Sequence, residues 1–267
     1  MRDRAPEGDV ALRPVRTGAA PADRVTGWVA VAVVLIGWEV LCRLLEVSSL
    51  YLPRPTQIAV ALYDLFVHKQ AITDLAVTLY RIFGGFAIGL VCGVALGLAM
   101  AVSRRLQSIA DVFIAALYPL PKITLIPLLI IWLGTGGPFM LTISALGALF
   151  PVIINTLLGV RQCDQGLVVT ARDLGASDRQ IVRHVLLPAA IPSVFAGARL
   201  GLGVSIILVV AAEMVVGKLG LGARLYLAGQ VLETETVFAV LVVLAALGIA
   251  VTKGLDSLDT LASRWRG

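Results

Sequence analysis

The sequence predicts an all-α, polytopic membrane protein with six transmembrane helices. Its 267 residues have a mean hydropathy of +0.93 and only 15% charged side chains, whereas charged residues make up roughly a quarter of a water-soluble domain. Six apolar stretches also reach the roughly 20 residues that a helix needs to cross the hydrocarbon. The stretches are continuous, which excludes barrel strands, because those alternate apolar and polar residues.

The distribution of basic residues predicts the orientation of these helices. The predicted spans cover about 27–45, 82–102, 109–133, 139–160, 193–216 and 237–254. Most of the 22 Lys and Arg residues fall in the segments that are cytoplasmic if the N-terminus is cytoplasmic, as the positive-inside rule requires. We therefore expect both termini in the cytoplasm, a disordered tail over 1–24, a transmembrane domain over 25–267 and a cytoplasmic loop over 161–192.

A short helix is expected between the first two spans. Pro53 and Pro55 prevent the first span from continuing as a helix, and an apolar stripe follows at i, i+4, i+7 and i+8. Its members are Ile58, Leu62, Leu65 and Phe66. This helix is predicted to lie along the outer interface, packed on the helix bundle.

The second span carries a glycine every four residues, which leaves one helix face without side chains. These glycines are Gly85, Gly89, Gly93 and Gly97. Small residues at this spacing let two helices approach closely in lipid. The stripe therefore predicts tight packing, either inside one subunit or between two subunits.

The third span contains Pro119, Pro121 and Pro127, so it must kink or break. Lys122 lies beside the predicted break, close to the middle of the bilayer, where an ionisable side chain is costly and commonly functional. It either lines a translocation path or pairs with a carbonyl or carboxylate. The same two readings apply to Glu213 in the fifth span, and Glu39 is a possible partner of one of them.

The loop from Arg161 to Pro192 reads as two short amphipathic helices joined at a fixed angle. Asp164 can cap the first helix, which has Leu167, Ala171 and Leu174 on one side, and Gly175 can end it in the left-handed conformation. A capping box, Ser177 to Gln180, opens the second helix. That helix has Ile181, Val185 and Leu186 on its apolar side and is expected to stop at Pro188, with Arg172, Arg179 and Arg183 on the polar surface of the loop.

This shape favours docking to another protein over an ordinary connector that lies on the headgroups. The stretch LGASDRQIVRHVLLPAAIP resembles the cytoplasmic EAA loop of ABC importer membrane subunits. The match lies at Ala171, Gly175, Leu187 and Pro188, while Val169 and Thr170 stand where the family pattern has Glu and Ala. The segments LPRPTQI, YPLPKITLIPLL and AAEMVVGKLGLGARL are similar to the nitrate, sulfonate, taurine and bicarbonate branch of these permeases.

The resemblance implies a type I ABC importer permease fold in the bacterial inner membrane. Two copies of the chain would form the path of a small anion, two ATPase subunits would each receive one loop, and a periplasmic or lipid-anchored binding protein would deliver the substrate. The chain has no G-x-x-x-x-G-K-[ST] motif; Gly217 and Lys218 are followed by Leu219. ATP and Mg are therefore expected on the partners, with no catalytic, metal, cofactor or nucleic-acid site in this chain.

Two sites follow: the coupling residues from the shape of the loop and the resemblance, and the path residues from the prolines and intramembrane ionisable side chains of the third and fifth spans. The ATPase-coupling residues are Leu167, Thr170, Ala171, Leu174, Gly175, Ala176, Ser177, Gln180, Ile181, Leu187 and Pro188. The path residues are Pro119, Pro121, Lys122, Pro127 and Glu213. Two other functions remain as alternatives: an ion-coupled secondary transporter, which would need more intramembrane carboxylates and inverted repeats, and a membrane assembly or scaffold protein that uses the loop as a binding arm.

Overall fold

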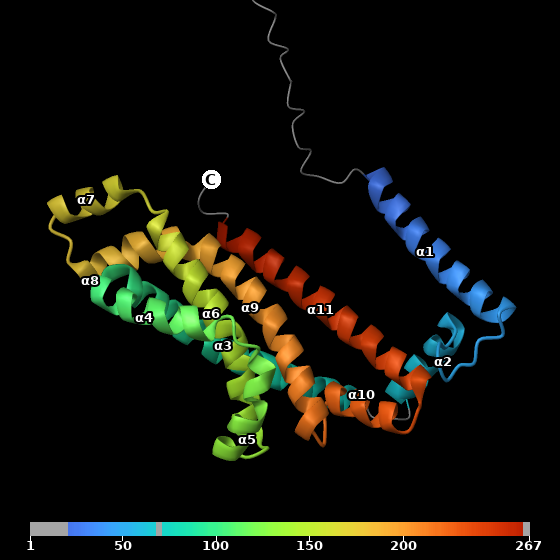
Figure 1. Ribbon diagram of the computed structural model, residues 1–267. Coiled ribbons are helices and arrows are strands. Elements are labelled where there is room, and N and C mark those ends of the chain that lie inside the picture. The colour runs from blue at the N-terminus through green and yellow to red at the C-terminus, as the bar shows by residue number, and fades with distance from the viewer. Residues whose placement is uncertain (1–20, 68–70, 264–267) are drawn as a thin grey trace, which may run out of the picture.

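The structure, a computed structural model, describes residues 21–67 and 71–263, and all regular elements in these ranges are helices (Figure 1). The longer helices are α1 (Pro21–Leu44), α3 (Ala71–Val102), α6 (Gly137–Arg161), α9 (Leu187–Val216) and α11 (Thr234–Ser263). The shorter ones are α2 (Pro55–Val67), α4 (Arg104–Leu117), α5 (Ile126–Leu133), α7 (Gln165–Asp173), α8 (Asp178–Ile181) and α10 (Leu221–Gln230). A 3₁₀ turn, η1 (Lys122–Leu125), precedes α5, and a π-helical segment, η2 (Val182–Leu186), joins α8 to α9.

Within residues 21–67 and 71–263, five helices are long and apolar enough to cross a membrane, and the count is six if the bent pair α4 and η1–α5 forms one span. The predicted all-helical class is therefore confirmed. Several boundaries differ from the predicted ones, most of all at two starts: α3 begins at Ala71, and the helix that contains α9 begins at Asp178. Residues 1–20 of the predicted tail lie outside the described residues, and residues 21–24 belong to α1.

The centre of the bundle is formed by α3, α6 and α9. The four glycines of the α3 stripe are buried against α6, where an added Cβ at Gly89 would come within 2.5 Å of the Ala145 carbonyl oxygen. The Ser144 hydroxyl of α6 donates to the Ile82 carbonyl of α3 at 2.9 Å, and the Ser205 hydroxyl of α9 donates to the Ser144 carbonyl at 2.8 Å. Close approach and interhelical hydrogen bonds therefore hold this three-helix core together.

The helices α1, α2 and α11 pack around this core less closely. In α2 the predicted apolar stripe is confirmed, with Ile58 and Leu65 buried, and the helix packs in a cluster with Leu221 and Val240 of α10 and α11. The α1 helix stands apart from the bundle in Figure 1. Its contacts include Trp38 against Phe238, with ring centroids 5.9 Å apart. This arrangement leaves most of α1 exposed on the single chain.

The third apolar segment is broken, as the prolines predicted. The axes of α4 and η1–α5 are bent by 93°, and Pro119 and Pro121 lie in the connection. Pro127 does not break a helix, because it lies in the first turn of α5, where a missing backbone donor costs nothing. The break is therefore caused by two of the three prolines.

The two ends of the bundle carry different elements. Figure 1 shows α7 and α8 projecting at one end, together with the C-terminal part of α11. The helices α2 and α10 lie at the opposite end. The helix α9 connects the two ends, because it follows α8 and leads into α10.

Candidate functional site

The projecting segment α7–α8, which we call the elbow, is fixed by three local devices. The Asp164 carboxylate accepts the Gly166 amide at 2.8 Å and caps α7. Gly175 has φ +83°, a conformation in which a side chain is strained. The Ser177 hydroxyl accepts the Gln180 amide, and the Ser177 amide donates to the Gln180 side chain at 2.7 Å. The predicted caps and turn are therefore confirmed.

An apolar cluster anchors the elbow to the bundle. Its buried members are Val160, Cys163, Ile181, Leu186 and Ala190. The half-buried side chains of Val168 and Ala171 in α7, Ala176 in the turn and Val185 in η2 pack against this cluster. One face of each elbow helix is thus held by the ends of α6 and α9.

The opposite face of α7 is free on the single chain. Leu167 is 57% exposed and Leu174 is 83% exposed, and Thr170 is exposed between them. The spacing i, i+3 and i+7 places these three side chains on one face, the outward stripe. Ala171, which we expected beside the two leucines, lies at the edge of this face, where its half-buried side chain packs against the apolar cluster. Exposed apolar side chains on a projecting helix mark an interaction surface.

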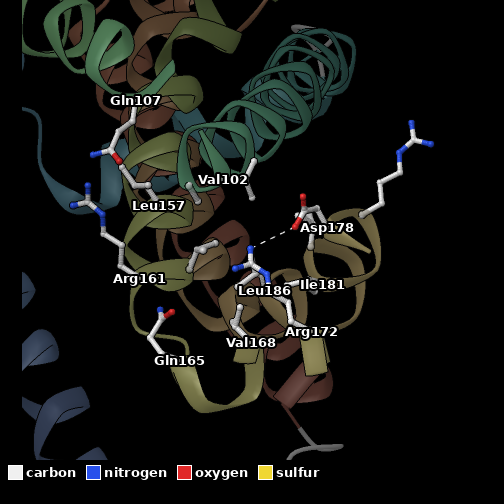
Figure 2. Close-up of a pocket in the computed structure, with 14 residues that line it drawn as sticks. Val102, Gln107, Leu157, Arg161, Gln165, Val168, Arg172, Asp178, Ile181 and Leu186 are labelled. Carbon is white, nitrogen blue, oxygen red and sulfur yellow. Dashed lines mark hydrogen bonds and ion pairs between the residues drawn. The ribbon is translucent and has the colours of Figure 1, made fainter. Parts of the chain in front are cut away.

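A cavity of about 580 Å³ lies between part of the elbow and the bundle, beside the apolar cluster (Figure 2). Val102 and Leu157 line it on the bundle side, and Val168 and Ile181 line it on the elbow side. Arg172 reaches across the turn to Asp178, with 3.5 Å between nitrogen and oxygen. The elbow is therefore attached at its two chain ends and by its apolar face, with space beneath it.

Pro188 does not stop the second elbow helix, contrary to our expectation. The helix continues from Asp178 to Val216. The π segment Val182–Leu186 widens the helix just before the proline, and the Leu187 amide donates to the Val182 carbonyl, five residues back. Pro188 then lies in the turn that follows the π segment, so the change in hydrogen-bond register coincides with a residue that has no N–H donor. Elbow and α9 therefore form one continuous helical element.

Lys122 lies at the break of the third segment, together with Pro119 and Pro121. Its ammonium nitrogen donates to the Tyr118 carbonyl oxygen at 3.2 Å. The same nitrogen lies 5.2 Å from the centre of the Tyr118 ring and 5.3 Å from that of Phe150, within range of a cation–π interaction. Of the two partners considered for Lys122, a carbonyl is the one present.

Glu213 lies elsewhere and is fully buried. Its carboxylate accepts from Arg81 Nη1 at 2.7 Å, from the Thr78 hydroxyl at 3.0 Å and from the Gly222 amide at 3.0 Å. These contacts correspond to the structural alternative for Glu213, and no contact joins it to Lys122 in the described chain. Glu39 pairs with neither, because it accepts from Arg43 and Thr56.

Sequence reasoning missed most of the network around Glu213. Asp74 accepts the Gly220 amide at 2.9 Å and pairs with Arg224, and Arg81 also donates to the Leu219 carbonyl. We call Asp74, Thr78, Arg81, Glu213 and Arg224 the distal polar network, because it lies at the end of α9 opposite the elbow. The sequence feature that could have predicted this network is the spacing of residues 74, 78 and 81, which places three polar side chains on one face of α3.

Comparison with known proteins gives the family of this chain. Residues 85–264 match the family model described as "Binding-protein-dependent transport system inner membrane component". The taurine transport system permease protein of Escherichia coli is 32% identical over 241 residues, which cover 88% of each chain. The nitrate import permease protein of Synechocystis is 28% identical over 242 residues, which cover 87% of each chain.

A solved structure supports the same assignment. The permease-like chain of the MetNI methionine ABC transporter, in an inward-facing conformation, superposes with a TM-score of 0.59 and 25% identity. The match covers 75% of this chain and 98% of that one. These relatives favour an ABC permease over an ion-coupled transporter or a scaffold. The chain therefore belongs to the family of binding-protein-dependent transport system inner membrane components, a family of multi-pass inner-membrane permeases that work with ATPase and binding-protein subunits.

Proposed function

We propose that this permease imports a small anion. The matched relatives include permeases for taurine, aliphatic sulfonates and nitrate, and all three substrates carry a compact, singly charged oxyanion group. The import would be driven by ATPase subunits that bind ATP and Mg, since this chain has no phosphate-binding loop. A binding protein would deliver the anion on the side of α2 and α10.

The elbow is proposed as the surface that docks into an ATPase subunit, and the outward stripe is the observation that carries this proposal. Leu167, Thr170 and Leu174 are exposed on a helix whose shape is fixed by caps at both ends. Because its shape is fixed, the elbow would move as a rigid unit together with the ATPase subunit that binds it. Because the elbow continues into α9, closure of the ATPase pair would shift α9 as a rigid element.

A second copy of the chain is proposed to complete the path. The residues around the break, including Pro119, Leu120 and Pro121, are exposed on the single chain. Irregular backbone at membrane depth is tolerated only against protein or a water-filled cavity. Two copies that face each other across this break would surround it with protein and enclose a water-filled path. In this arrangement α1 would lie outermost, against lipid. Because the elbow would dock to an ATPase subunit inside the cell, we propose that the elbow and both termini lie in the cytoplasm.

Co-purification tests the docking surface. The double variant Leu167→Asp/Leu174→Asp places two charges on the outward stripe, and we expect it to remain in the membrane but to lose its ATPase subunit. Gln162→Asp, an exposed residue at the root of the same loop, is the matched control and should retain that subunit. Retention of the ATPase by the double variant at wild-type level would exclude the outward stripe as the docking surface.

A further inference from the structure

Lys122 differs from three arginines of the long helices that are paired with acids. The pairs are Arg43 with Glu39, Arg81 with Glu213 and Arg199 with Asp256. Among the described residues, Lys122 contacts no carboxylate; its partners are the Tyr118 carbonyl and two aromatic rings. Its positive charge is therefore only partly compensated, within a segment apolar enough to span the membrane.

The surroundings of Lys122 hold the ammonium in place without neutralising it. Phe150 is buried in α6, so its ring gives the ammonium a fixed support. Tyr118 is exposed, and its ring lies 6.3 Å from that of Phe150. An ammonium has three N–H donors, and the Tyr118 carbonyl occupies one of them. Two donors remain for a ligand that approaches along the exposed side of the break.

A compact monoanion is the ligand that best complements this arrangement. A sulfonate, nitrate or carboxylate group offers several acceptor oxygens and one negative charge, and hydrogen bonds between charged groups are the stronger kind. A cation–π contact occupies no acceptor oxygen and does not neutralise the charge, so an arriving anion can bind the ammonium while the rings stay in place. A single lysine would also release the anion again, which a conducting path requires.

We propose that Lys122 forms the transient binding site for the anionic group of the substrate at the broken third span. The proposal rests on the proposed import of a small anion. In the empty state the Tyr118 and Phe150 rings and the Tyr118 carbonyl hold the ammonium. As the substrate passes, its oxyanion accepts the two remaining N–H groups. Tyr118 and Phe150 are thus positioning residues, and Lys122 is the contact residue.

Uptake into proteoliposomes tests the site, with the permease reconstituted together with its ATPase subunits and binding protein. The probes are radiolabelled taurine, ethanesulfonate and nitrate. Lys122→Met removes the charge at similar length, and the loss of a charged hydrogen bond is expected to lower uptake of the transported probe at least about tenfold. Lys122→Arg keeps the charge and donors and should retain most of the uptake. Lys218→Met is the matched control, because Lys218 is exposed near the end of α9, away from the break.

Two measurements separate this proposal from the proposed function. Retention of the ATPase subunit after purification reports folding and assembly, and Lys122→Met should retain it at wild-type level. If the wild-type complex hydrolyses ATP but takes up none of the three anions, the proposed function is wrong. If the wild type imports one of them and Lys122→Met imports it equally well, or if Met and Arg variants lose the same amount, the anion contact at Lys122 is excluded.

Discussion

Arg81 Nη1 lies 2.7 Å from the Glu213 carboxylate, which joins α3 to the last turn of α9 across 132 residues of sequence. Glu213 is fully buried and Arg81 is largely buried. Three consecutive backbone amides, those of Gly220, Leu221 and Gly222, also donate to the distal polar network. The segment that leads into α10 is thereby fixed to two helices of the core, at the end of α9 opposite the elbow.

Breaking this pair should destabilise the protein strongly. Removal of one partner of a buried ion pair leaves an uncompensated charge, which costs about 3–5 kcal/mol. We therefore expect Arg81→Met to lower the free energy of unfolding by an amount in that range, measured by denaturation of the purified complex in detergent. Arg172→Gln is the control, because its pair with Asp178 is largely exposed and should contribute less than about 1 kcal/mol.

A side chain at Gly175 should uncouple transport from ATP turnover. The residue has φ +83° and no atom within 4 Å of an added Cβ, so Gly175→Val is opposed by backbone strain and not by a clash. The elbow angle should change while the membrane helices remain intact. The measurement is uptake per ATP hydrolysed. Gly254→Val, at an equally open glycine with ordinary φ in α11, should leave that ratio unchanged, and a normal ratio in Gly175→Val would contradict a rigid elbow.

Loss of the capping box should loosen the start of α8 only. Ser177→Ala removes the hydroxyl that accepts the Gln180 amide, at a cost of about 1 kcal/mol. Hydrogen exchange of the amides at residues 178–181 should accelerate roughly fivefold. Ser257→Ala provides the comparison, since that hydroxyl bonds to a carbonyl within α11 and caps nothing. Unchanged exchange at α8 would show that the box does not stabilise the elbow.

The glycine stripe of α3 should not accept side chains. An added Cβ at Gly89 would meet the Ala145 carbonyl at 2.5 Å and the Ala148 methyl at 2.8 Å, both on the facing helix α6. Gly89→Leu would have to separate these helices, and overpacking costs typically about 1–3 kcal/mol, sometimes more. The yield of monodisperse protein in detergent should fall sharply. Gly37→Leu in α1, with no atom within 4 Å, should give a wild-type yield.

Several features of the fold could be predicted from neighbouring residues alone. The caps at Asp164 and Ser177 and the left-handed Gly175 depend on contacts within three residues. The break of the third segment follows from two closely spaced prolines. Each of these features depends only on a few neighbouring residues, so those residues are sufficient to predict it.

Other features depend on which helices meet. The sequence left open whether the α3 glycines pack inside one chain, and only the approach of α6 showed that they do. It grouped Ala171 with two exposed leucines although this side chain packs against the apolar cluster, because the amphipathic pattern does not say how much of α7 the bundle covers. Pro188 was expected to end the helix. The helix continues because the residues before it form a π segment, a change of hydrogen-bond register that no local rule predicted.

By itself, the sequence determined that the chain is helical, spans a membrane and carries a pre-shaped elbow between two spans, because hydropathy, proline and capping act over short distances. Only the tertiary structure decided that Glu213 is held by Arg81 and Thr78 while Lys122 meets no carboxylate. The physical reason is that a buried charge is stabilised by partners from helices distant in sequence. Those partners are set by packing, which no short stretch of the chain contains.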